Sequence, residues 1–188
     1  MVIFLDFDGV LHSAFVEKIS DIGLEAFYAK DARGVQDRIL SGDFFHPDKI
    51  ELIYNTILPY VPKIVISSTW RRDFTMEELK RFLGKLGEFV VDITGEAERR
   101  SELNQRHSEI RAYIDKHDLG KKPFVIIDDD KLLNFYIHGR QVMTSSRVGF
   151  TKDDELSLNN ILKDASVKPA GYFDRVLNAR NEYIKSKK

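Results

Sequence analysis

Three apolar segments of this chain each lead directly into carboxylate or hydroxyl side chains. Continuous apolar runs of four or five residues are typical of strands buried on both faces of a parallel sheet. Because the carboxyl ends of parallel strands meet at one edge of a sheet, we expect the three polar clusters to lie together. The segments are residues 2–5 with Asp6 and Asp8, residues 64–66 with Ser67, Ser68 and Thr69, and residues 124–127 with Asp128 and Asp129.

Helical patterns alternate with these strands. Apolar spacing predicts helices at about residues 47–60, 76–85, 104–117, 152–163 and 170–185, and two further strands at 89–93 and 141–144. Local signals support the boundaries: Pro47 suits a first helical position, Thr75 with Glu78 resembles a capping box, Gly120 suits a C-terminal cap, and Thr151 suits an N-terminal cap. Strands alternating with helices predict the α/β class, with a mainly parallel sheet between helices.

Residues 12–45 fit this alternation poorly and predict a small insertion over the carboxyl end of the sheet, with a short helix near residues 22–30. This insertion is too short to form a separate domain. At 188 residues, we therefore expect a single domain spanning residues 1–188.

The composition limits the sites and the electrostatic partners of the chain, although a local basic patch remains open. The net charge of −1 gives no bulk attraction to nucleic acid or to a membrane surface. The absence of cysteine excludes disulfides and thiolate metal sites. No apolar run is as long as a membrane span, and the N-terminus leads straight into a strand without the pattern of a signal peptide, so we expect a cytoplasmic protein. The sequence does not indicate an oligomeric state.

Asp6 and Asp8 present two like charges on one strand end, and side chains two residues apart point to the same face. A divalent cation, a shared proton, or a bend that Gly9 permits could each relieve the repulsion. An Asp-rich turn is the structural alternative, but three converging polar clusters favour a functional site. Oxygen ligands without His or Cys suit Mg²⁺. Asp6 and Asp129 are the predicted direct ligands, with Asp8 contributing through its backbone and Asp128 supporting them.

Arg106 is the cation that we expect to face this site. Its spacing places it on the inward stripe of the helix at 104–117, where a cation near a helix N-terminus needs an anion nearby. Lys121 and Lys122 are alternatives, and Arg71 follows the second strand closely enough to contact a substrate. We expect Trp70 to pack in the core, and His12 is the histidine nearest to the predicted site.

These motifs resemble those of the haloacid dehalogenase (HAD) superfamily. The segment from Asp6 to Val10 resembles its DxDG[TV] signature, residues 64–67 its second motif, and residues 124–129 its fourth motif. Arg106 is similar to its third motif, a lone cation. Three further segments resemble a small-cap HAD group associated with RNA-repair ("Swiss Army Knife") proteins, which implies a Rossmann-like three-layer sandwich. They are the Ser-Ser-Thr-Trp-Arg segment at residues 67–71, the Arg106-x-x-Glu109-Ile110 segment and residues 148–151.

The resemblance implies a phosphatase that uses an aspartyl-phosphate intermediate and Mg²⁺. Asp6 corresponds to the nucleophile and Asp8 to the general acid and base. Ser67, Ser68, Arg71 and Arg106 are the expected substrate-binding residues, and Asp6, Asp8, Asp128 and Asp129 are the expected metal-binding residues. The expected substrate is a nucleotide, a nucleic-acid end or a small phosphorylated metabolite. A phosphotransferase and a non-catalytic Mg²⁺- and phosphate-binding module are the alternatives.

Overall fold

The computed structural model of the protein describes residues 1–12, 45–96, 105–120, 122–132 and 140–167. Most of the predicted insertion, the short helix predicted near residues 22–30, and the helix predicted at residues 170–185 lie outside the described residues. The prediction of a single domain therefore stays a prediction.

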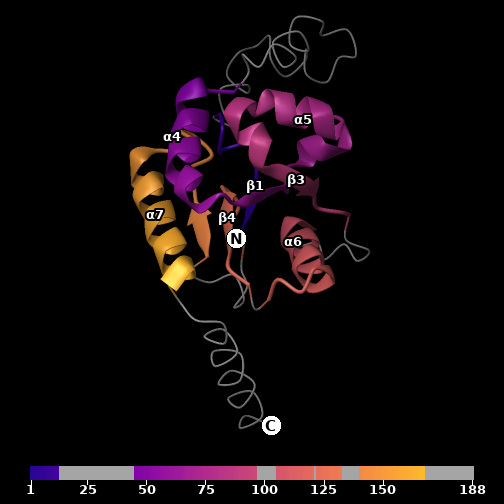
Figure 1. Ribbon diagram of the computed structural model, residues 1–188. Helices are drawn as coiled ribbons and strands as arrows, with labels where there is room; N and C mark the ends of the chain where they lie inside the picture. The colour runs from indigo at the N-terminus through magenta and orange to yellow at the C-terminus, as the bar shows by residue number, and fades with distance from the viewer. Residues whose placement is uncertain (13–44, 97–104, 121, 133–139, 168–188) are drawn as a thin grey trace, which may run out of the picture.

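A five-stranded sheet forms the centre of the described structure (Figure 1). Its order is β3-β2-β1-β4-β5, and every pair of neighbouring strands is parallel. This arrangement confirms the predicted α/β class, with β1 at the centre of the sheet. The strands are β1 (Val2–Leu5), β2 (Lys63–Ile66), β3 (Val90–Ile93), β4 (Phe124–Asp128) and β5 (Gln141–Met143).

The helices between the strands lie close to the predicted ranges. Pro47 occupies the first turn of α4, and Thr75 and Glu78 form the predicted capping box of α5. Thr151 and Asp154 cap α7 reciprocally: each backbone N–H donates to the other's side chain. The helical elements are α4 (Pro47–Ile57), η1 (Leu58–Tyr60), η2 (Thr69–Arg72), α5 (Met76–Phe82), η3 (Gly84–Phe89), α6 (Gln105–Lys116) and α7 (Lys152–Val167).

Three predicted boundaries need correction. The helix predicted at 47–60 changes into a 3₁₀ turn after Ile57, and the helix predicted at 76–85 ends at Phe82 before a second 3₁₀ segment. Gly120 does not cap α6, because Asp118 adopts the left-handed conformation at φ 49° instead. Asp tolerates this conformation better than most residues, and the Leu119 N–H then donates to the Ile114 carbonyl at 2.9 Å to close the helix end.

Strand alternation decides which polar residues share a face of the sheet. Ile3 and Leu5 of β1 pack in the larger core cluster with α4, α5 and α7, whereas Phe4 packs in a second cluster with Ile110 and Ile114 of α6. Figure 1 shows α6 on the opposite side of the strands from α4 and α7. The alternation continues past the strand end, and residues two apart lie on the same face. Asp6, two residues after Phe4, therefore lies on the face that α6 covers.

The same alternation holds in the two neighbouring strands. Val65 of β2 and Ile126 of β4 pack in the cluster with α6, so Ser67 and Asp128, two residues later, also belong to that face. The three polar clusters predicted from sequence therefore converge beside a single helix, α6. None of the helices in the described part of the chain is long and apolar enough to span a membrane.

Candidate active site

Three carboxylates meet at the carboxyl end of β1 and β4. Asp6, Asp128 and Asp129 each offer one oxygen to a group whose atoms all lie within 4.8 Å of one another. Asp6 and Asp128 are buried, and Asp129 is partly exposed. The predicted convergence of the first and fourth motifs is therefore present in the structure.

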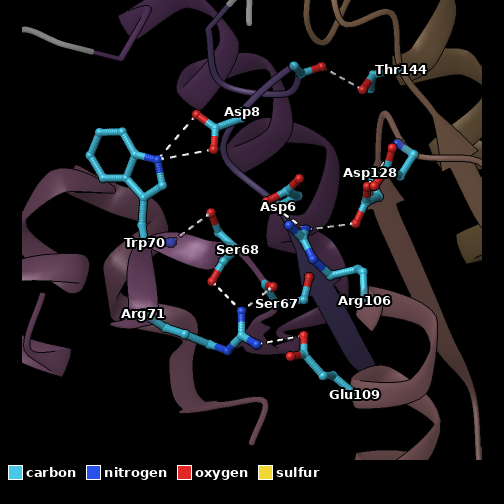
Figure 2. A network of polar contacts seen from close by, with 12 residues as sticks. Asp6, Asp8, Ser67, Ser68, Trp70, Arg71, Arg106, Glu109, Asp128 and Thr144 are labelled. Atoms are coloured by element: carbon cyan, nitrogen blue, oxygen red, sulfur yellow. Dashed lines mark hydrogen bonds and ion pairs between the residues drawn. The ribbon is translucent and has the colours of Figure 1, made fainter. Parts of the chain in front are cut away.

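Arg106 joins two of these carboxylates. Its Nη1 lies 2.8 Å from Oδ1 of Asp6 and 3.0 Å from Oδ2 of Asp128. Figure 2 shows the guanidinium between the two acids, reaching them from the first turn of α6. Of the two lysines proposed as alternatives, Lys122 is exposed and Lys121 lies outside the described residues. Arg106 is thus the cation that the fold brings to the cluster.

Burial and mutual repulsion disfavour the charged forms of the acids. Burial, and next the nearby Asp6 charge, raise the pKa of Asp128, although Arg106 opposes this. Burial also raises the pKa of Asp6, against the opposing effect of Arg106. For Asp129, burial and then the charges of Asp6 and Asp130 raise the pKa to about 6. Ionisation of all three acids together is therefore unfavourable, even with Arg106 beside them.

A divalent cation fits this donor set. The three carboxylates supply only oxygen ligands, which Mg²⁺ prefers, and their raised pKa values indicate that additional positive charge would be favourable there. Asp6 and Asp129 are suited to direct ligation. Asp128 already accepts hydrogen bonds from Arg106 and, at 2.9 Å, from the Asp130 N–H, which suits a supporting role.

Gly9 is required by the close approach of Asp129. A Cβ atom at Gly9 would lie 2.3 Å from Oδ2 of Asp129, and Gly9 has φ +67°. The Gly9 carbonyl accepts a 2.7 Å hydrogen bond from the buried Thr144 hydroxyl, which ties this turn to the end of β5. Glycine thus permits both the backbone bend and the position of the Asp129 carboxylate.

Asp8 does not join the carboxylate cluster. Its carboxylate accepts the Trp70 indole N–H at 3.2 Å to each oxygen (Figure 2). Nε2 of His12 lies 3.0 Å from Oδ1. Of the three ways to relieve the repulsion between Asp6 and Asp8, the structure therefore contains the bend. The Asp8 side chain is not among the grouped metal ligands, which leaves its backbone carbonyl as the predicted contribution.

The second motif contributes a buried hydroxyl. Ser67 is fully buried, and among the described residues its Oγ has no hydrogen-bond partner. A buried hydroxyl without a partner is unfavourable, so a ligand oxygen beside it would be stabilising. Ser68 is also buried, but its Oγ accepts from the Trp70 N–H at 3.4 Å and caps η2. The geometry therefore favours Ser67 over Ser68 as a substrate ligand.

Arg71, predicted to contact substrate, is bound within the protein by backbone carbonyls and by an acid. Its guanidinium donates to the carbonyls of Ser67, Ser68 and Thr94 at 2.8, 2.6 and 2.9 Å. Its Nη2 also lies 2.6 Å from Oε2 of the buried Glu109. Because these contacts occupy the N–H groups of the guanidinium, we infer that Arg71 supports the loop after β2 in place of the expected contact with substrate.

Glu109 supports the site, a role that the sequence interpretation did not give it, although it belongs to the Arg106-x-x-Glu109-Ile110 segment of the family resemblance. It lies three residues after Arg106 on α6, and its carboxylate contacts Arg72 and Gln105. The same carboxylate also contacts Arg71 (Figure 2). This contact fastens α6 to the segment after β2, and so holds Arg106 near Asp6. The i, i+3 spacing from Arg106 was the available signal, because residues three apart share a helix face.

Comparison with known proteins agrees with the geometry. Residues 2–154 match the family model described as the HAD domain in Swiss Army Knife RNA repair proteins. No curated protein and no solved structure gives a match to the chain. The matched region contains every residue of the candidate site, and family membership indicates phosphatase-type chemistry. The chain belongs to the HAD superfamily, as a HAD domain of the kind found in Swiss Army Knife RNA repair proteins.

Proposed function

We propose that the protein is a Mg²⁺-dependent phosphomonoester hydrolase that acts through an aspartyl-phosphate intermediate. The observation that carries the proposal is the convergence of Asp6, Asp128 and Asp129 within 4.8 Å, beside Arg106. Clustered buried acids are unfavourable for stability alone, so their convergence supports a role in binding and chemistry.

In the first step, an Asp6 carboxylate oxygen attacks phosphorus and the bond from phosphorus to the leaving oxygen breaks. Asp8 gives its proton to the leaving oxygen, so the product departs as an alcohol. In the second step, Asp8 takes a proton from water as that water attacks phosphorus, which releases phosphate and restores the Asp6 carboxylate.

The other residues bind the phosphoryl group in both steps. The partnerless Ser67 hydroxyl is suited to donate to a phosphoryl oxygen, and Arg106 supplies a fixed positive charge at the nucleophile. Asp6 and Asp129 would hold Mg²⁺, with the Asp8 carbonyl, and Asp128 would support them. A bound Mg²⁺ would supply positive charge that offsets the carboxylates and the phosphoryl oxygens.

The description of the family as a domain of RNA repair proteins supports a phosphorylated nucleic-acid end as the substrate. The net charge of −1 does not favour long, non-specific contact with nucleic acid, which is compatible with recognition of an end. A substrate panel of 3′- and 5′-phosphorylated oligoribonucleotides, mononucleotides and sugar phosphates tests this choice. Preference for mononucleotides or sugar phosphates would contradict it.

The reaction itself is tested with p-nitrophenyl phosphate. We expect hydrolysis that requires Mg²⁺, stops with EDTA, and falls roughly a thousandfold or more in Asp6→Asn. Asp115→Asn is the matched control, because Asp115 is exposed and pairs only with Arg111 among the described residues. Full activity of Asp6→Asn, or of the wild type in EDTA, would refute the proposal.

The covalent step has its own measurement. A substrate labelled in its phosphoryl group should transfer that label to the protein, and hydroxylamine should release it, because acyl phosphates are labile to this nucleophile. Turnover without a labelled protein would contradict an aspartyl phosphate. Transfer of the label to an added alcohol in place of water would identify a phosphotransferase. Labelling without turnover would identify a phospho-acceptor, and phosphate binding without labelling or turnover would identify the non-catalytic module.

A further inference from the structure

The indole of Trp70 makes a directed contact with Asp8. Nε1 of Trp70 lies 3.2 Å from both Oδ1 and Oδ2 of Asp8, so one N–H faces the whole carboxylate. Asp8 is 38% exposed at its side chain, whereas Trp70 is 4% exposed. The buried indole N–H of Trp70 therefore binds the Asp8 carboxylate, which is partly open to solvent.

The position of Trp70 is determined by aromatic packing. Its ring centroid lies 6.0 Å from that of Phe7, 5.2 Å from Phe45, 5.4 Å from Phe74 and 6.3 Å from Phe82. Rings packed on several sides have little freedom to rotate, so the direction of the indole N–H is also restricted. The Asp8 carboxylate, in contrast, is more exposed and precedes the turn at Gly9, so its orientation depends on the partners that bind it.

The indole suits the orientation of an acid that must exchange protons. An indole N–H donates but does not accept, so it can bind the Asp8 carboxylate without taking its proton. Nε2 of His12, 3.0 Å from Oδ1, lies near the same group and stacks against Phe45. Tertiary packing of β1 and η2 thus holds Asp8 at a fixed place beside the candidate active site.

We propose that Trp70 is a positioning residue that orients Asp8 for proton transfer to and from the substrate. This inference rests on the proposed phosphatase function. The proton moves from the Asp8 carboxyl to the leaving oxygen as the bond to phosphorus breaks, and the indole N–H remains on Trp70 throughout. Trp70 therefore acts through Asp8 and does not itself contact the reacting atoms.

The dependence on the leaving group tests this role. An alkyl phosphate has a basic leaving oxygen that needs a proton, whereas p-nitrophenolate leaves without one. Trp70→Phe keeps an aromatic ring but removes the N–H donor. We expect its kcat/KM for glycerol phosphate to fall about tenfold more than its kcat/KM for p-nitrophenyl phosphate, a fraction of the full effect of a general acid. An equal loss on both substrates, or no loss, would overturn the inference.

Two further variants separate positioning from general damage to the packing. Phe74→Leu disturbs the same aromatic cluster without touching the Asp8 contact, so it should not change the ratio between the two substrates. In an Asp8→Asn background, Trp70→Phe should cause no further selective loss on the alkyl phosphate, because its effect passes through Asp8. Additive losses in the double variant would overturn the inference.

A spectroscopic measurement does not depend on the folding of Trp70→Phe. The chain contains 1 tryptophan, so a ¹⁵N-labelled sample gives a single indole N–H signal. We expect this signal to move upfield in Asp8→Ala, because the hydrogen bond to a carboxylate is lost. An unchanged signal would overturn the inference.

Failure of the two proposals can be told apart. If the wild type hydrolyses neither substrate, or if Asp6→Asn remains active, the proposed function fails whatever the Trp70 variants do. If the wild type is active and Asp8→Asn loses alkyl phosphate selectively while Trp70→Phe does not, only the role of Trp70 is refuted.

Discussion

Replacing Asp129 by Asn should make the metal-free protein more stable. The substitution preserves the shape of the side chain and removes its charge. Burial, together with the charges of Asp6 and Asp130, raises the pKa of Asp129 from 3.8 to about 6, so folding penalises the ionised form. At neutral pH without a cation, the wild type must fold with this unfavourable charge, whereas Asp129→Asn does not.

The magnitude follows from the size of this shift. About two pKa units at roughly 1.4 kcal/mol per unit give an upper limit of about 3 kcal/mol. Asp129 is only half-buried, and solvent screening reduces the effect, so we expect a gain of about 1 to 2 kcal/mol. The folded-state pKa is the higher one, so the wild type has its full relative stability below about pH 4 and loses it as the pH rises through 6. The gain in the variant should therefore be absent near pH 4 and complete above pH 7.

Urea unfolding in EDTA and in Mg²⁺ measures both parts of the argument. In EDTA at neutral pH, the transition midpoint of Asp129→Asn should lie above that of the wild type. A cation that binds only the folded state at a hundredfold excess over its Kd stabilises by about 2.7 kcal/mol, so Mg²⁺ should raise the wild-type midpoint and change that of the variant much less. Asp115→Asn, at an exposed position, should respond to Mg²⁺ like the wild type.

Two outcomes would refute this reasoning. If Asp129→Asn is less stable than the wild type in EDTA, Asp129 is not under electrostatic strain in the folded protein. If Mg²⁺ stabilises the variant as much as the wild type, Asp129 does not contribute to a cation site.

Two other substitutions test the support of the site. Gly9→Ala should lower the free energy of unfolding by about 1 to 3 kcal/mol, because its Cβ would lie 2.3 Å from the Asp129 carboxylate and φ is +67°. Gly120→Ala, where a Cβ meets nothing within 4 Å, is the control, and equal urea midpoints for the two variants would contradict the argument. Glu109→Gln should cost about 3 kcal/mol in urea unfolding, since it leaves a buried arginine without its counter-charge. Glu51→Gln removes an exposed pair and should leave the urea midpoint close to that of the wild type; a similar loss in both variants would refute the structural role of Glu109.

Much of the fold could be predicted because its signals are local or periodic. The apolar runs and the helical spacing predicted the parallel α/β class, and the capping box at Thr75 and the Pro47 start depend only on neighbouring residues. The helix ends were less accurate, since α5 ends at Phe82 and a 3₁₀ segment follows. The prediction that Gly120 caps α6 was wrong. It relied on the general preference for glycine at helix ends, whereas Asp118 is the residue that adopts the left-handed conformation.

The meeting of three polar strand ends at one edge of the sheet could be predicted from the sequence, because parallel strands present their carboxyl ends together. The shared face of Asp6, Ser67 and Asp128 needed the register between β1, β2 and β4 and the packing against α6, because alternation relates residues only within one strand. The presence of Arg106 at the cluster could also be predicted, from its position on the inward stripe of α6.

The division of the remaining side chains between support and chemistry depends on contacts that form only in the folded chain. Arg71 turns to Glu109 and to backbone carbonyls, and Asp8 turns to Trp70, because those partners come from segments distant in the sequence. The pKa of Asp129 likewise depends on burial and on the charge of Asp6, which exist only in the folded chain. Periodicity along a strand determines the face on which a residue lies, but contacts and burial, which determine its role, arise only when the elements pack together.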